Sequence, residues 1–132
     1  MATWQYAVHT NVNFILDNNF RVFFFSEPPS ALRVVNVTHR SVQLEWQPGF
    51  HGGMDQYFRL EYNPTGNKQH IYSGPPKYWD VYPANAYSAI ISDLEPGVEY
   101  SIDVMSINNL GESNFTLDPV IVRTASKLET KS

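Results

Sequence analysis

The chain has 132 residues, of which 42% are hydrophobic and 14% aromatic, so it is long enough and apolar enough to bury the core of one domain. Charged residues make up only 17%, the formal net charge is -4, and lysines and arginines do not cluster, which excludes the electrostatic footprint of a nucleic-acid-binding domain. The cysteine count is 0, which excludes disulfides, thiolate metal sites and cysteine nucleophiles, and no apolar run is long enough to span a bilayer.

Residues 1–26 form an apolar N-terminal extension that we predict to lie outside the domain that follows. Its segment NFILDNNFRVFFF is β-prone, carries little charge and ends abruptly at SEPPSA. Three interpretations stay open: an extra strand or partner-binding arm, the end of an upstream domain, or non-native coding, since Phe-Phe-Phe-Ser can be written by a pyrimidine run such as precedes an exon. The N-terminus also lacks the basic start, apolar stretch and cleavage site of a secretory signal.

From about residue 31 onward, the chain consists of short runs in which apolar and polar residues alternate, separated by proline and glycine. Within one run, Leu60 and Tyr62 fall on one face. Arg59 and Glu61 fall on the other. A period of two is typical of a strand with one buried and one exposed face, so the pattern predicts an all-β, antiparallel sandwich of six or seven strands. The runs are ALRVVNV, SVQLEWQ, QYFRLEY, YSAIISDL, VEYSIDVMSI and PVIVRT.

Several of these segments, taken in order, resemble a fibronectin type III domain over residues 27–125. Trp46 resembles the core tryptophan of the second strand, and Leu94-Glu95-Pro96-Gly97-Val98-Glu99-Tyr100 resembles the L-x-P-x-x-x-Y tyrosine corner. VMSINNLGES resembles the strand-to-loop pattern V-x-A-x-N-x-x-G-x-S, with Ser106 in place of alanine. The resemblance implies a seven-stranded antiparallel β-sandwich of immunoglobulin-like topology, followed by a flexible tail at residues 126–132.

Seven residues are expected to form the structural core of this domain rather than its functional site. In the resembled family the phenol oxygen of the corner tyrosine bonds back to the loop backbone, which is the role expected of Tyr100. The core residues are Trp46, Leu60, Tyr62, Leu94, Tyr100, Ile102 and Val104.

A narrower resemblance concerns WQPGFHGGMDQYFRLEY, which is similar to a signature in fibronectin repeats of nephrin-, echinoid- and turtle-type adhesion receptors of the immunoglobulin superfamily. His51 stands where that signature has an acidic residue. The resemblance implies a juxtamembrane module of a neuronal or epithelial adhesion molecule.

The loop Asn108-Asn109-Leu110-Gly111 could cradle a phosphate, present a peptide or turn the chain. We predict a turn, with Gly111 at a positive φ and an asparagine side chain capping it. A phosphate cradle needs a helix N-terminus after the glycines, and no helical pattern follows. The Arg-Gly-Asp sequence of integrin-binding family members is absent from this loop.

Three segments are candidate contact surfaces for a protein partner: the loops 50–55 and 108–113, and the aromatic connection SGPPKYWDVYPANAY, which we place in or beside a long loop. Exposed tyrosine and tryptophan are frequent interface anchors. The favoured alternative is that Trp79 and Tyr82 fold back over the edge of the sandwich. The candidate contact residues are Phe50, His51, Tyr78, Trp79, Tyr82, Asn108, Asn109 and Leu110.

Two glycosylation sequons begin at Asn36 and Asn114. The four histidines, which are His9, His39, His51 and His70, share no metal-ligand spacing and are interpreted as scattered surface residues. No nucleophile elbow or carboxylate pair in a cleft context is present, so we expect neither an enzyme nor a cofactor or metal.

Together these observations predict a non-catalytic interaction and spacer module in the extracellular part of a plasma-membrane adhesion receptor. Its partner would be a protein, either a second copy or a different molecule. Two alternatives stay open: a structural repeat of an intracellular, muscle-type protein, and an accessory repeat of a secreted enzyme.

Overall fold

The computed structural model describes residues 5–7, 14–65, 75–83, 85–113 and 119–127. Every regular element in this part of the chain is a β-strand, so it contains no helix that could cross a membrane. The strands are β1 (Gln5–Ala7), β2 (Phe14–Leu16), β3 (Val22–Phe24), β4 (Ser30–Val37), β5 (Val42–Gln47), β6 (Gln56–Pro64), β7 (Lys77–Val81), β8 (Ser88–Ile91), β9 (Glu99–Asn108), β10 (Gly111–Glu112) and β11 (Val120–Arg123).

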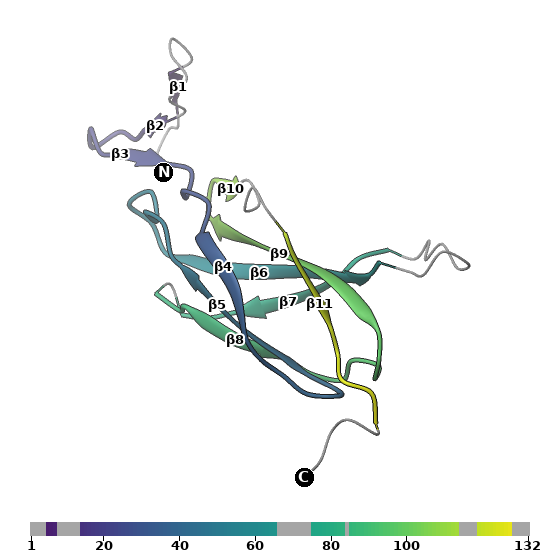
Figure 1. Cartoon of the computed structure of the whole chain (residues 1–132). Coiled ribbons are helices and arrows are strands. Elements are labelled where there is room, and N and C mark those ends of the chain that lie inside the picture. The colour runs from purple at the N-terminus through teal and green to yellow at the C-terminus, as the bar shows by residue number, and fades with distance from the viewer. Residues whose placement is uncertain (1–4, 8–13, 66–74, 84, 114–118, 128–132) are drawn as a thin grey trace.

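Two antiparallel sheets lie face to face and form the domain (Figure 1). One sheet has the order β4-β5-β8. The other has the order β10-β9-β6-β7, and β11 pairs with β9. The predicted seven-stranded sandwich is therefore confirmed, with β4 to β9 and β11 as its strands.

The core lies between the sheets because alternate residues of the paired strands point inward. In β6, the side chains of Phe58 and Leu60 have no exposed surface, whereas Tyr57 and Arg59 are half-buried. Burying a large apolar side chain contributes about 1.5–3 kcal/mol to stability, so this inner layer supplies most of the driving force for folding. All seven residues predicted for the core are at most 8% exposed: Trp46, Leu60, Tyr62, Leu94, Tyr100, Ile102 and Val104.

The predicted tyrosine corner is present at the start of β9. The hydroxyl oxygen of Tyr100 accepts a hydrogen bond of 3.0 Å from the backbone N–H of Glu95. Leu94 is buried beside it, and its backbone N–H donates to the carbonyl oxygen of Arg40 at 2.9 Å. The corner thus ties the chain leaving β8 to the turn between β4 and β5.

The strand β7 corrects one sequence prediction, because Tyr78 and Trp79 lie in a strand and not in a long loop. Residues Lys77–Val81 pair along the whole length of β7 with β6. The short run KYWDV alternates in the same way as the other strands, with Trp79 directed inward and Tyr78 outward. A glycine and two prolines before this run, and a proline after it, made the whole connection resemble a loop in sequence.

The N-terminal extension contains the small sheet β1-β2-β3 and is hydrogen-bonded to one end of the sandwich. The N–H of Phe24 donates to the carbonyl oxygen of Gly52 at 2.9 Å, and the Nδ2 of Asn108 donates to the carbonyl oxygen of Phe24, also at 2.9 Å. The approach is so close that a Cβ on Gly52 would lie 1.9 Å from the Phe24 oxygen. The predicted domain start at residue 27 stays a prediction, and most of the predicted tail, residues 128–132, lies outside the described residues.

Candidate protein-interaction surface

The outer face of the sheet that contains β6, β7 and β9 carries an ordered row of aromatic and charged side chains. Register places Arg59 of β6 between Asp80 of β7 and Met105 of β9. One step further along the strands, Glu61 lies between Tyr78 and Asp103. Apart from Met105, which is 4% exposed, these outward side chains alternate with the buried ones, so the same strands build the core and this surface.

Arg59 is held in place by Asp80 and by two tyrosine rings. Its Nε donates to Oδ1 of Asp80 at 2.7 Å, and its Nη2 donates to Oδ2 at 3.0 Å. The guanidinium carbon lies 5.5 Å from the ring centroid of Tyr78 and 5.8 Å from that of Tyr57. A bidentate ion pair combined with cation–π contacts fixes the side chain, and the hydrogen bond to Asp80 raises the pKa of Arg59 above its ordinary value.

A stacked pair of tyrosines extends this row. The rings of Tyr57 and Tyr82 have centroids 4.9 Å apart and an interplanar angle of 20°. Tyr82 is nevertheless 67% exposed and Tyr78 is 52% exposed, so both rings present contact area to solvent. We name the set Tyr57, Arg59, Tyr78, Asp80 and Tyr82 the tyrosine–arginine row.

Carboxylates surround the tyrosine–arginine row. Glu61 and Asp103 are directly opposite each other on β6 and β9. Partial burial, together with the negative charge of Asp103, raises the pKa of the Glu61 carboxyl above its ordinary value. Glu112 of β10 also acts on Arg59 through its negative charge.

The three aromatic residues predicted as contacts in and beside β7 point in different directions. Trp79 is half-buried and packs against the core cluster, as in the alternative of folding back over the sandwich edge. Tyr78 and Tyr82 point away from the core and join the row with Tyr57. Only two of these three aromatics are therefore available to a partner.

The predicted contact loops lie at the end of the sandwich that meets the N-terminal extension. Phe50 is 49% exposed, and its ring centroid lies 6.4 Å from that of Phe24 and 5.1 Å from that of His51. Asn109 is exposed and Leu110 is half-buried.

Asn108, in contrast, is 6% exposed and acts within the chain. Its Oδ1 accepts from the N–H of Leu110 at 2.9 Å, and Gly111 has a φ of 139°. This is the predicted capped turn. The buried side-chain amide of Asn108 also donates hydrogen bonds to the carbonyl oxygens of Phe24 and His51.

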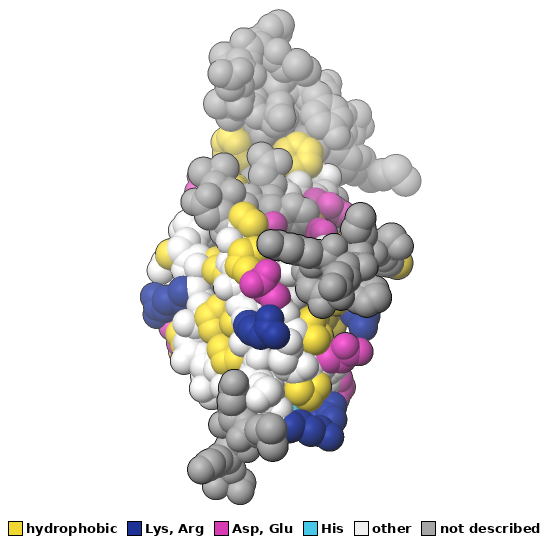
Figure 2. Space-filling view, turned by 45° about the vertical axis from the view of Figure 1, so that its right-hand side comes forward, with side chains coloured by type: hydrophobic (Ala, Val, Ile, Leu, Met, Phe, Trp, Pro, Cys, Tyr) yellow, Lys and Arg dark blue, Asp and Glu magenta, His cyan; other side chains and the backbone are white. Residues whose placement is uncertain are grey.

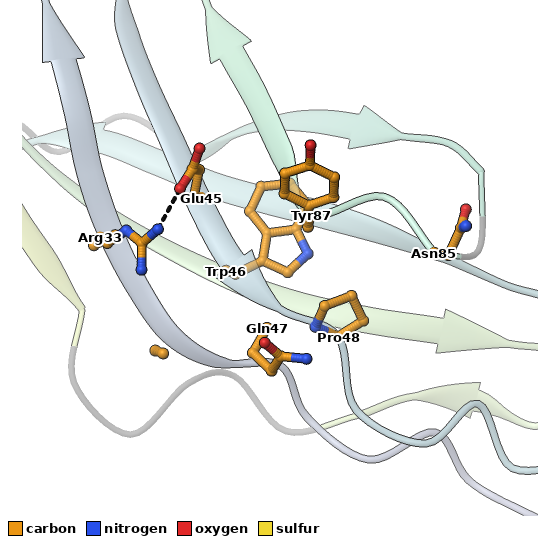
Figure 3. Close-up of a pocket in the computed structure, with 8 residues that line it drawn as sticks. Arg33, Glu45, Trp46, Gln47, Pro48, Asn85 and Tyr87 are labelled. Atoms are coloured by element: carbon orange, nitrogen blue, oxygen red, sulfur yellow. Dashed lines mark hydrogen bonds and ion pairs between the residues drawn. The ribbon is translucent and has the colours of Figure 1, made fainter.

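A shallow depression of about 470 Å³ lies beside the core tryptophan, and Figure 3 shows the side chains that line it. The Nε1 of Trp46 has no hydrogen-bond partner among the described residues and is shielded from solvent. Tyr87 lines the same depression and is itself 61% exposed. Because the indole N–H is shielded from solvent, the depression offers a ligand no exposed donor at Trp46 and is a weaker candidate than the sheet face.

Among the described residues, the predicted glycosylation sites and histidines do not come together in one site. Asn36 is exposed on β4, whereas Asn114 lies outside the described residues, as do His9 and His70. His51 is exposed and its Nδ1 accepts from the N–H of Gly53 at 2.9 Å. His39, predicted to be at the surface, is half-buried with a shielded Nδ1. Within the part of the chain that the structure describes, no group of histidine and carboxylate residues could hold a metal ion.

Figure 2 shows another view of the described surface, in which basic and acidic side chains are interspersed with hydrophobic ones. Lysines and arginines do not gather into one patch on this face, in agreement with the composition.

Sequence reasoning missed Tyr57, Asp80 and Glu112 as members of the outer surface. The alternation in QYFRLEY already placed Arg59 and Glu61 outward. Recognition of KYWDV as a strand with the same alternation would have added Asp80, but its register against β6 is visible only in the structure.

Comparison with known proteins agrees with the observed two-sheet fold. The family model described as "Fibronectin type III domain" matches residues 27–122. Nephrin from Mus musculus is 34% identical over 108 residues, which cover 82% of this chain and 8% of nephrin. Nephrin from Homo sapiens is 38% identical over 87 residues, which cover 66% of this chain and 6% of nephrin. The chain therefore spans less than a tenth of the length of these relatives.

Among solved structures, the fn3 domain of the human collagen alpha-1(XX) chain aligns with a TM-score of 0.59 and 24% identity, covering 82% of this chain and 93% of that one. This likeness concerns the fold. The family match over most of the chain and the identity to nephrin establish more: the chain belongs to the fibronectin type III domain family and resembles the domains of nephrin-type adhesion receptors.

Proposed function

We propose that this domain is a non-catalytic interaction and spacer module in the extracellular part of a cell-adhesion receptor. The observation that carries the proposal is the tyrosine–arginine row, an exposed and ordered aromatic surface on a domain related to those of nephrin. Tyrosine side chains provide large contact area at low conformational cost, which suits a protein-binding face. The two-sheet scaffold would also separate neighbouring domains along a receptor.

Protein–protein contact is tested with beads that carry the full chain. Beads coated with the chain and beads coated with albumin are mixed with cultured epithelial or neuronal cells, with and without prior protease treatment of the cells. We expect binding that exceeds the albumin control and is lost after protease treatment. Equal binding of both kinds of bead would contradict the interaction role.

The extracellular location is tested by expression behind an added signal peptide. The secreted protein is weighed intact, with and without glycosidase, beside the variants Asn36→Gln and Asn114→Gln. We expect glycosidase-sensitive mass at one or both asparagines, which the matching variant removes. Efficient secretion with both sites bare would remove this support and bring the intracellular spacer level with the proposal.

A further inference from the structure

We infer that one end of the sandwich is a clamp that holds the chain entering the domain by its backbone. The clamp consists of the loop 49–53 and of the end of β9 at Ser106 and Asn108. It holds residues 22–27, which we name the entry segment and which would then be a rigid part of the spacer and not a free linker. The inference rests on the spacer role in the proposed function, because it states how the spacer is joined to the chain before it.

The first anchor point of the entry segment is Phe24, at the end of β3. Its N–H donates to the carbonyl oxygen of Gly52 at 2.9 Å, and its carbonyl oxygen accepts from Nδ2 of Asn108 at 2.9 Å. β3 also pairs with β2, so these two bonds attach the small N-terminal sheet to the sandwich (Figure 1). Phe24 precedes the residues matched by the family model, so this anchor is an addition of this chain to the domain.

The second anchor point is Glu27. Its N–H donates to the carbonyl oxygen of Phe50 at 2.8 Å, and its carbonyl oxygen accepts from Oγ of Ser106 at 2.8 Å. Ser106 stands where the resembled pattern has alanine, and its hydroxyl makes a bond that alanine cannot make. With both backbone groups paired at two residues three positions apart, the path of the entry segment over the sandwich is fixed.

Glycine permits the close approach of the two backbones at both anchor points. A Cβ on Gly49 would lie 2.9 Å from the carbonyl oxygens of Glu27 and Pro28, and a Cβ on Gly52 would lie 1.9 Å from the carbonyl oxygen of Phe24. Real Cβ atoms are not found at such distances, so a side chain at either glycine would displace the entry segment. The loop is therefore fitted to another stretch of backbone.

The polar side chains of the clamp are shielded from solvent. Ser106 has no exposed surface, Asn108 is 6% exposed, and Ser26, between the two anchor points, is 4% exposed. Hydrogen bonds in such a shielded place are electrostatically stronger than those that compete with water. Both clamp side chains donate into the backbone of the entry segment, which favours its docked position.

NMR of the ¹⁵N-labelled full chain tests the inference on two timescales. Relaxation should give residues 22–27 order parameters of about 0.85, the value of a rigid backbone. Amide hydrogen exchange at Phe24 and Glu27 should be slowed as it is in the strands of the sandwich. Order parameters below about 0.6 across the entry segment would overturn the inference, as would exchange at both amides at the rate of an unstructured peptide.

Asn108→Asp separates the clamp from the turn that Asn108 also caps. The variant keeps an oxygen that can accept the N–H of Leu110 and removes the amide that donates to the carbonyl oxygen of Phe24. Asn109→Asp adds the same charge at an exposed neighbour and is the control. We expect faster exchange at Phe24 and lower order parameters in the entry segment for Asn108→Asp, and wild-type values for Asn109→Asp.

Gly52→Ala and Gly53→Ala form a second matched pair. Both glycines have a positive φ, 80° and 90°, so both variants carry similar backbone strain. Only at Gly52 does the new Cβ meet the backbone of the entry segment, whereas at Gly53 it makes an ordinary contact of 3.4 Å with the ring of Phe23. We expect release of the entry segment by Gly52→Ala alone, while the amides of β9 stay protected and report a folded sandwich.

The two pairs of variants decide the inference even where one variant fails to fold. Release by Asn108→Asp or by Gly52→Ala, without release by the matched control, would support the clamp. An entry segment that stays ordered in every folded variant of the two, or that is released equally by variant and control, would overturn it.

Sedimentation and the bead assay separate this inference from its alternatives. We expect a monomer with a protected amide at Phe24. A dimer whose dissociation removes that protection would place the entry segment of one copy on the clamp of another and overturn the inference. Bead binding equal to the albumin control would count against the interaction role, and the NMR measurements would still decide the clamp. A released entry segment would overturn the clamp while cell binding stands.

Discussion

On the inner side of β6, Phe58 and Leu60 have no exposed surface, while on the outer side Tyr57 and Arg59 lie against solvent and against other exposed side chains. Both sets come from alternate positions of one nine-residue strand. Inner residues contact many apolar neighbours, and outer residues contact a few specific charged or aromatic ones. Substitutions on the inner face should therefore change stability, and those on the outer face should change binding.

The largest effect is expected from Trp46→Ala. Trp46 is 4% exposed, and its ring centroid lies 5.5 Å from that of Phe58 in the centre of the sandwich. Truncation of a buried tryptophan to alanine costs about 3–5 kcal/mol, a large share of the stability of a small domain. Urea denaturation should show this loss, and Tyr87→Ala, at the exposed side of the same indole, serves as the control with a much smaller loss.

Tyr100→Phe should have the next largest effect. The change keeps the ring in the core and removes only the hydroxyl that accepts the N–H of Glu95. An N–H group left without its partner costs about 1–3 kcal/mol. Urea denaturation measures the loss, and an unchanged midpoint would show that water replaces the hydroxyl at this corner.

Trp79→Ala and Tyr78→Ser compare the two faces within a single strand. Trp79 packs on the core, so its truncation should lower the free energy of unfolding by about 1–2 kcal/mol and change the binding of a partner less. Tyr78 points outward, so its replacement should cost less than about 1 kcal/mol while weakening the binding of the coated beads to cells. A Trp79→Ala protein with unchanged melting and lost binding would reverse this assignment.

The contrast between the faces also explains which parts of the structure could be predicted from the sequence. The period of two in QYFRLEY and VEYSIDVMSI predicted strands, the buried Leu60 and Val104, and the outward Arg59. A strand with one buried face has apolar residues at alternate positions, and this pattern is visible in the sequence. Tyr100 and Gly111 were also predictable, since a corner and a capped turn depend on residues close in sequence.

The outer surface could not be predicted to the same extent, since it depends on register between strands distant in the chain. The contact of Arg59 with Asp80 joins residues 21 positions apart. The burial of Asn108, which was predicted as a contact residue, depends on Phe24 and His51, which lie 84 and 57 positions away. A loop polar residue looks the same in sequence whether it faces a partner or holds a distant backbone carbonyl.

The smallest effect is expected from Glu61→Gln, and its sign distinguishes an acidic surface from a paired one. Partial burial and Asp103 raise the pKa of Glu61 in the folded chain, so the folded state binds this proton more tightly than the unfolded state. The associated stability is fully present below the ordinary pKa of glutamate and is lost as the pH rises through the raised value. Glu61→Gln should therefore stabilise the domain slightly at about pH 7 and give no advantage near about pH 3, where the wild-type carboxyl is already neutral.

Thermal melting at both pH values, with Glu95→Gln as the control for loss of one charge, measures the difference. A destabilised Glu61→Gln protein at neutral pH would mean that the charge of Glu61 is compensated within the chain.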